Sequence, residues 1–204
     1  GRLLKKAIMN IAQSLTYDGE ILAVTPCSLR QKIADYTLLF PLILFDYCRF
    51  TNDMDFLKEM LPVCEQINQY FSKFSRADGL LEHVCTQWNM VDWPENLRDN
   101  YDFKLTDPIG EGCHNVINAF YIGSIITTEK IKKSLDIAYT PISSPLIEAF
   151  HKCFYDKEKC LYTDSEVSAH SSLHANCIPV FFGFSPETGR EKLAKFLLNK
   201  GFSC

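Results

Sequence analysis

The stretch Gln31–Phe50, QKIADYTLLFPLILFDYCRF, decides the fold class of this chain. From Leu38 to Phe45 every residue is apolar, and a helix with so little polar surface must be buried on most of its sides. This apolar run includes Pro41 and is far shorter than the roughly 20 residues that a membrane-spanning helix needs. The sequence therefore predicts a buried helix inside a globular protein and no membrane span.

A second kind of helix alternates with the buried kind. After the capping residues Asn52 and Asp53, apolar side chains recur three and four positions apart up to Phe74, which is typical of a helix with one buried face. Ser171–Phe182 is again almost entirely apolar, with Pro179 inside it. The same patterns predict further helices over residues 3–15, 110–126, 129–138, 144–154 and from Ser185-Pro186 to a stop at Gly201.

A turn with an aspartate recurs between these helices. It lies at Asp18-Gly19, Asp78-Gly79 and Asp156–Lys159, and a short extended piece and a polar loop follow each turn. Such self-similarity indicates a repeated pair of helices. Buried and amphipathic helices that alternate favour two layers, with the polar loops gathered at one end. We predict an all-α fold, an (α/α) toroid of helical hairpins; a plain helical bundle or a solenoid would give a similar periodicity.

Composition excludes several functions. The 204 residues carry a formal net charge of -4 with both signs interspersed, whereas a nucleic-acid-binding protein needs a basic face. Nine cysteines form no Cys-x-x-Cys pair, so we expect no zinc motif and no other metal or cofactor. Free thiols weakly favour a reducing compartment, which leaves the localisation open.

The polar stretch Val91–Phe103 is the first candidate site. It places Trp93 beside Asp92 and further carboxylates, and Pro94 stops any helix that arrives from upstream. A flat aromatic ring beside hydrogen-bond acceptors suits a sugar, although an isolated tryptophan is more often a packing residue.

Three further clusters each precede a buried helix. Asp35 and Tyr36 begin the first one, where a carboxylate is also favoured simply by the helix dipole. Glu111 lies between two glycines at the start of another, and His174 begins the apolar helix near residue 171. His174 and His170 are four residues apart and could share a helical face, but no third metal ligand follows at a suitable spacing. Carboxylates and aromatics converging on one cavity suit carbohydrate chemistry.

The order of short motifs along the chain resembles the six-hairpin (α/α) catalytic domain of bacterial α-L-rhamnosidases. The resemblance spans the chain up to Phe184, and we expect residues 1–204 to form one part of such a domain. It is carried by these motifs: Asp18-Gly19-Glu20, Pro26, Ile33-x-Asp35-Tyr36, Asp92-Trp93-Pro94, Asn118–Tyr121 and His174–Asn176.

The resemblance implies an inverting glycoside hydrolase that releases terminal rhamnose from glycosides or polysaccharides. It implies that Trp93 walls the sugar site with Asp92 as a loop-fixing neighbour, and that Asp35, Tyr36 and His174 lie near the cavity. Glu111 is a candidate from its position alone, where a helix cap or a ligand contact would lie. The family's acidic signature and its Trp-Glu segment are missing from residues 1–204, so the catalytic acid and base are expected outside them. The partner would then be the rest of the catalytic domain, and family habit points to the periplasm or the exterior. A non-catalytic carbohydrate-binding or scaffold module, or another (α/α)-toroid glycosidase, is the alternative.

Overall fold

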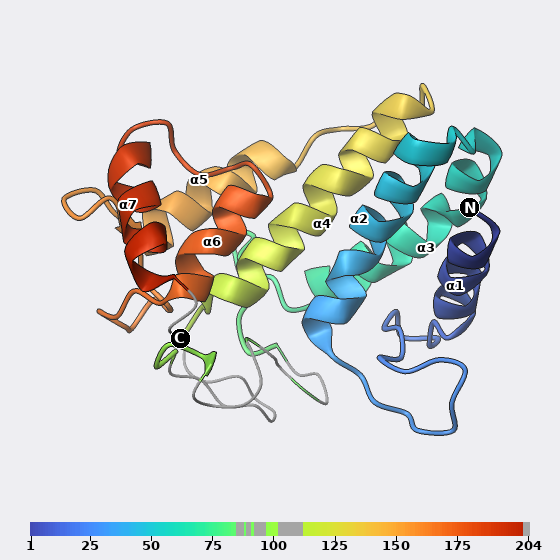
Figure 1. The fold of residues 1–204 in the computed structure, drawn as a ribbon, viewed down its shortest axis with the longest axis horizontal. Coiled ribbons are helices and arrows are strands. Elements are labelled where there is room, and N and C mark those ends of the chain that lie inside the picture. The colour runs from blue at the N-terminus through green and yellow to red at the C-terminus, as the bar shows by residue number, and fades with distance from the viewer. Residues whose placement is uncertain (85–87, 89–90, 92–96, 102–111, 202–204) are drawn as a thin grey trace.

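A computed structural model describes residues 1–84, 88, 91, 97–101 and 112–201, and in this part the chain forms seven helices and one small hairpin (Figure 1). The helices are α1 (Arg2–Gln13), α2 (Ala34–Thr51), α3 (Met54–Ser72), α4 (Asn115–Ser134), α5 (Ser143–Phe154), α6 (Leu173–Phe181) and α7 (Arg190–Lys200). The strands β1 (Tyr155–Asp156) and β2 (Leu161–Tyr162) pair antiparallel. Among the described helices, none has the length and hydrophobicity to cross a bilayer.

The apolar helices α2 and α4 bury much of their surface, as their composition requires. Figure 1 shows α2 and α4 side by side, and the two helices pack against each other and against α3. On its other side α4 packs against α5 and α6. The amphipathic α1 buries only Ile8 completely. The contacts of α4 with both α2 and α6 agree with the predicted inner layer (α2, α4, α6) and outer layer (α1, α3, α5). The helix α6 nevertheless buries only Ala175, Asn176 and Pro179, and its Val180 and Phe181 are exposed.

The repeated turn has the same backbone feature at each of its three places. Gly19 has φ 112°, Gly79 has φ 87° and Cys160 has φ 57°. Positive φ is accessible to glycine without strain, which explains why two of the three positions are glycine. Two positions after each of these residues, Ile21, Leu81 and Tyr162 each donate a backbone hydrogen bond to a side chain of the next inner helix.

An asparagine on the inner helix ties the segment after the turn to the helix start. The amide of Asn118 in α4 accepts a hydrogen bond from Leu81 N (2.7 Å) and donates one to Leu81 O (3.0 Å). Asn176 in α6 repeats both bonds with Tyr162, at 2.8 Å and 3.0 Å. Each asparagine also donates, at 2.8 Å, to the backbone oxygen four residues before it in its own chain segment. We call this arrangement the asparagine clamp.

The first unit has a threonine at the corresponding place. Thr37 lies four residues after the residue that caps α2, as the asparagines do in α4 and α6, and its hydroxyl accepts from Ile21 N at 3.4 Å. It also donates to Ile33 O at 3.2 Å. The three helical pairs thus share one connection, which explains the repeat seen in the sequence.

Three predicted helix boundaries are wrong, the first being the start of α4, which is Asn115 and not residue 110. A break between residues 126 and 129 does not exist, because α4 continues to Ser134. Thr127 and Thr128 interrupt the apolar pattern, but their hydroxyls donate to carbonyls of the preceding turn, and Thr128 also accepts from Asn68 of α3 at 2.9 Å. The final helix begins at Arg190 after Gly189 (φ 86°) and not at Pro186, while Gly201 ends it as predicted.

Candidate functional site

The first turns of α2, α4 and α6 lie at the same end of the molecule (Figure 1). Each helix start carries backbone N–H groups without intrahelical partners and the positive end of a helix dipole. Of the three predicted clusters, those at Asp35-Tyr36 and at His174 fall in described residues, and both lie in these first turns. Polar groups that are far apart in the sequence are therefore gathered at one end, as the repeat predicts.

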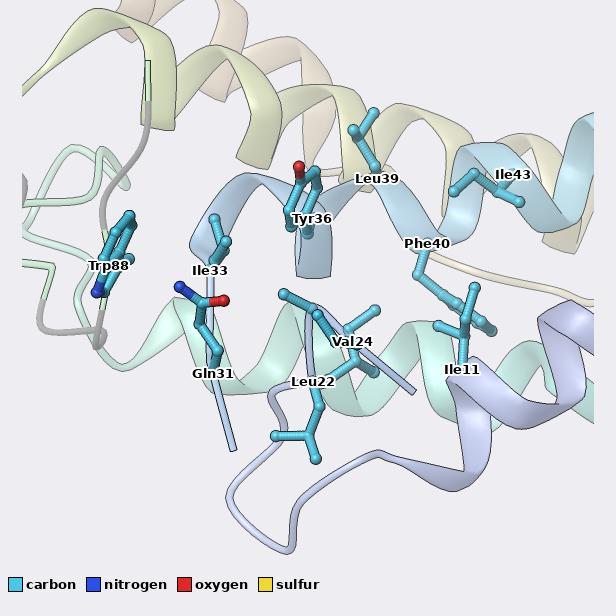
Figure 2. A pocket seen from close by; sticks show the side chains of 12 residues that line it. Ile11, Leu22, Val24, Gln31, Ile33, Tyr36, Leu39, Phe40, Ile43 and Trp88 are labelled. Atoms are coloured by element: carbon cyan, nitrogen blue, oxygen red, sulfur yellow. The ribbon is translucent and has the colours of Figure 1, made fainter. Parts of the chain in front are cut away.

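A cavity of about 540 Å³ opens beside the start of α2 (Figure 2). Its walls are Trp88, the α2 side chains Tyr36, Leu39, Phe40 and Ile43, and residues of α1 and of the segment before α2: Ile11, Ile21, Leu22, Ala23, Val24, Gln31 and Ile33. Most of these side chains are apolar, and the polar ones include Gln31, Trp88 and Tyr36. An apolar cavity with a few polar groups and three aromatic side chains, Tyr36, Phe40 and Trp88, is suited to a small polar-faced ligand such as a sugar.

The backbone holds Trp88 against the segment that leads into α2. Ala34 N donates to Trp88 O at 3.3 Å and Trp88 N donates to Lys32 O at 3.1 Å. These two bonds form a parallel bridge across Ile33 and fix the half-buried indole at the cavity. Sequence reasoning passed over Trp88 in favour of Trp93. The available signal was a tryptophan between polar residues, five positions before the other one.

Asp35 and Tyr36 occupy the first turn of α2, as expected. Tyr36 is 46% exposed and lines the cavity, whereas Asp35 is half-buried. A carboxylate in the first turn is favoured by the helix dipole whatever else it does. The position of both residues agrees with the prediction, and their contact with a ligand stays a prediction.

His174 is half-buried in the first turn of α6. His170 lies before the helix begins, so the two histidines do not share a helical face as an i, i+4 pair. Nδ1 of His170 instead lies 2.6 Å from Oδ2 of the fully buried Asp164. The shared helical face that their spacing allowed is therefore not formed.

Two carboxylates accept hydrogen bonds from backbone amides at the start of α6. Oδ1 of Asp164 accepts from Ser172 N at 2.7 Å, and Oδ2 of Asp99 accepts from Leu173 N at 2.7 Å. Burial would raise the pKa of Asp99, but the ion pair with Lys200 (2.7 Å) and the bond from Leu173 N together hold that pKa below its usual value. Asp99, one of the carboxylates crowded into the loop Val91–Phe103, is thus engaged in capping a helix.

Three predicted site residues, Asp92, Trp93 and Glu111, lie outside the described residues. Their expected roles remain predictions. Asn118 and Asn176, which belong to the motifs that carry the family resemblance, are fully buried and serve in the asparagine clamp.

Several solved structures are similar in fold to this chain. Similar solved structures include a GH78 family rhamnosidase of Bacillus sp. GL1 (TM-score 0.76, 17% identity), a rhamnosidase from Klebsiella oxytoca with rhamnose bound (0.75, 16%) and the Streptomyces avermitilis α-L-rhamnosidase complexed with L-rhamnose (0.66, 17%). Each similarity covers 97% of this chain but only 20%, 37% and 18% of those chains, respectively. No curated protein matches the chain.

The sequence itself also matches a known protein family. The family described as the bacterial alpha-L-rhamnosidase 6 hairpin glycosidase domain matches residues 1–204, which is the whole sequence. The inner and outer helices, their repeated turns and the polar end agree with that architecture. The chain belongs to the bacterial α-L-rhamnosidase six-hairpin glycosidase family.

Proposed function

We propose that this chain is part of a glycoside hydrolase that releases terminal rhamnose, and that the cavity at Trp88 and Tyr36 holds a sugar ring. The observation that carries the proposal is the pair of aromatic side chains at the end where the inner helices begin. An indole face covers the apolar face of a pyranose, while hydroxyl and amide groups at the edge of the cavity bond to its hydroxyls. The family match and two similar rhamnosidases solved with rhamnose support rhamnose as the sugar.

Hydrolysis would follow the two-carboxylate scheme. One carboxylic acid protonates the leaving oxygen, and a carboxylate on the opposite face of the sugar activates the attacking water. We assign neither role within the described residues. Asp99 and Asp164 are engaged at the start of α6. Asp35 does not line the cavity, so we propose that it contacts the sugar only through water and acts as neither the acid nor the base.

Replacing Trp88 tests the sugar site. We expect Trp88→Ala to weaken rhamnose binding by about tenfold, because the loss of one stacking face costs on the order of 1 kcal/mol. Trp88→Phe should retain most of the affinity, since a flat ring remains. Binding is measured by isothermal titration calorimetry with L-rhamnose, and D-glucose serves as the comparison sugar.

A matched control separates the site from general loss of aromatic surface. Phe50, at the far end of α2, is 87% exposed and distant from the cavity wall, so Phe50→Ala should leave rhamnose affinity unchanged. Equal affinity of the wild-type and Trp88→Ala proteins would remove Trp88 from the sugar site. Absence of aryl α-L-rhamnoside hydrolysis by the natural polypeptide that carries this sequence would contradict the enzymatic proposal itself.

A further inference from the structure

Three side chains from distant parts of the sequence meet outside the cavity described above. The carboxylates of Glu82 and Glu166 and the thiol of Cys113 place one donor atom each so that all three atoms lie within 4.8 Å of one another. Backbone contacts fix the three segments: Glu82 and Cys113 form an antiparallel bridge, and Glu166 N donates to Cys113 O at 2.9 Å. The donors are therefore held together by the fold and not by chance overlap of long side chains.

The neighbouring charges are not balanced. Arg76 bonds to Glu166 at 2.7 Å, pairs with Asp78 at 3.0 Å and lies 3.7 Å from Glu82. Three carboxylates thus share one guanidinium, which leaves a local excess of two negative charges. Such an excess attracts a cation, and more strongly where part of the site is shielded from water.

The thiol of Cys113 is the second indication of a ligand. It is fully buried, it is a free cysteine, and its sulfur makes no hydrogen bond to any described residue, yet it lies within 4.8 Å of a carboxylate oxygen of each glutamate. Cys113 belongs to the apolar core, and its sulfur lies at the edge of that core, beside the two carboxylates. One sulfur and two carboxylate oxygens are a donor set that a zinc ion takes.

We infer that Glu82, Cys113 and Glu166 form a binding site for a zinc ion or a cation of similar softness. Zinc takes sulfur and carboxylate ligands in a tetrahedron, with bonds of about 2.3 Å to sulfur and about 2.1 Å to oxygen, so neighbouring ligand atoms lie about 3.5 Å apart. The donors must approach by about 1 Å, which the partly exposed glutamates permit. Calcium and magnesium prefer oxygen ligands alone and fit the thiol poorly.

Binding exchanges a proton for the metal at Cys113. The S–H proton leaves to solvent, a Zn–S bond forms, and one carboxylate oxygen from each glutamate completes three protein ligands. The fourth position is open to water, since the side chains of Glu82 and Glu166 are 29% and 38% exposed. The ion would brace the extended segment at residue 82 against the segments that lead into α4 and α6.

The test is metal binding by the chain itself, in reduced and chelator-treated form. Co²⁺ serves as the spectroscopic probe, because a cobalt–thiolate bond gives a charge-transfer absorption that carboxylates alone do not. We expect one equivalent of Co²⁺ to produce this absorption, Zn²⁺ to displace it, and Zn²⁺ at about 100-fold excess over its Kd to raise the Tm by about 5 °C or more.

Variants assign the ligands. Cys113→Ser should abolish the absorption, and Glu82→Gln and Glu166→Gln should each lower the affinity by at least about tenfold, since even groups that only support a ligand cost that much when removed. The exposed Cys27 provides the control, and Cys27→Ser should bind as the wild type does. The glutamate variants keep the test valid if Cys113→Ser does not fold.

Two outcomes would overturn the inference. One is the absence of any thiolate absorption in the wild-type chain, which would mean that protein groups such as Arg76 and the backbone N–H of Cys113 satisfy these carboxylates without a cation. The other is an absorption that persists in Cys113→Ser or is unaffected in both glutamate variants, which would place the cobalt at another cysteine. Neither outcome depends on rhamnose, so the test is independent of the proposed glycosidase function.

Discussion

Asn118→Ala is expected to lower the free energy of unfolding by about 3 kcal/mol. The substitution removes the partners of Leu81 N–H and Leu81 C=O, both of which lie in the buried interior, and each buried backbone group left without a hydrogen bond costs about 1–3 kcal/mol. Because a protein of this size has about 5–15 kcal/mol of stability in total, the variant should unfold at a clearly lower urea concentration. Circular dichroism in a urea titration measures this midpoint.

Asn176→Ala should have a similar effect, because Asn176 makes the same three bonds in α6. The control is Asn199→Ala on the exposed surface of α7, which should change stability by no more than about 0.5 kcal/mol. If Asn118→Ala and Asn199→Ala proved equally stable, the asparagine clamp would have no energetic role.

Gly19→Ala should destabilise the protein by a comparable amount, about 3 kcal/mol. Its φ of 112° is unfavourable for alanine, and the added Cβ would lie 2.5 Å from Tyr70 Cβ and 2.9 Å from Gln66 O. Neither of these atoms is at the end of a flexible side chain, so α3 itself must move. Thermal unfolding followed by circular dichroism measures the change as a fall in Tm.

Gly79→Ala is the matched comparison, since Gly79 occupies the same place in the second turn. Its φ of 87° also disfavours alanine, but the new Cβ would meet only Leu146 Cδ2, at 2.6 Å, and a leucine side chain can rotate away. We therefore expect a loss of about 1 kcal/mol, attributable mostly to the backbone. Equal losses in the two variants would contradict the assignment of the larger cost to the contact with α3.

Much of the fold could be predicted because its helices and turns follow from local sequence patterns. The apolar run in α2 and the three-and-four spacing in α3 are properties of short windows, and each turn has its aspartate nearby. The continuity of α4 could not be predicted in this way, because Thr127 and Thr128 look like a break until Asn68 of α3 is placed beside them. The start of α7 was obscured by Pro186, which is a good first residue for a helix but lies before Gly189.

The site was harder to predict because its residues meet only in three dimensions. Asp35 and Tyr36 could be found because they begin a helix. Asn118 and Asn176 look like groups that could bond to a polar ligand, and only the structure shows that backbone partners already occupy them. The set Glu82, Cys113 and Glu166 has no recognisable spacing, so the expectation of no metal rested on short motifs alone.

The threonine at position 37 has a consequence for how the molecule opens. One hydroxyl holds Ile21 N at 3.4 Å where the asparagines hold both backbone groups of Leu81 and Tyr162. The helical pair α1–α2 is thus stabilised by fewer hydrogen bonds at this connection, and α1 contributes a single completely buried side chain, Ile8. Local fluctuations should begin there, so in a hydrogen–deuterium exchange experiment the amide of Ile21 should exchange well before those of Leu81 and Tyr162. The amino-terminal helical pair would then unfold locally as a separate cooperative unit, while the two pairs that contain the asparagine clamp remain folded.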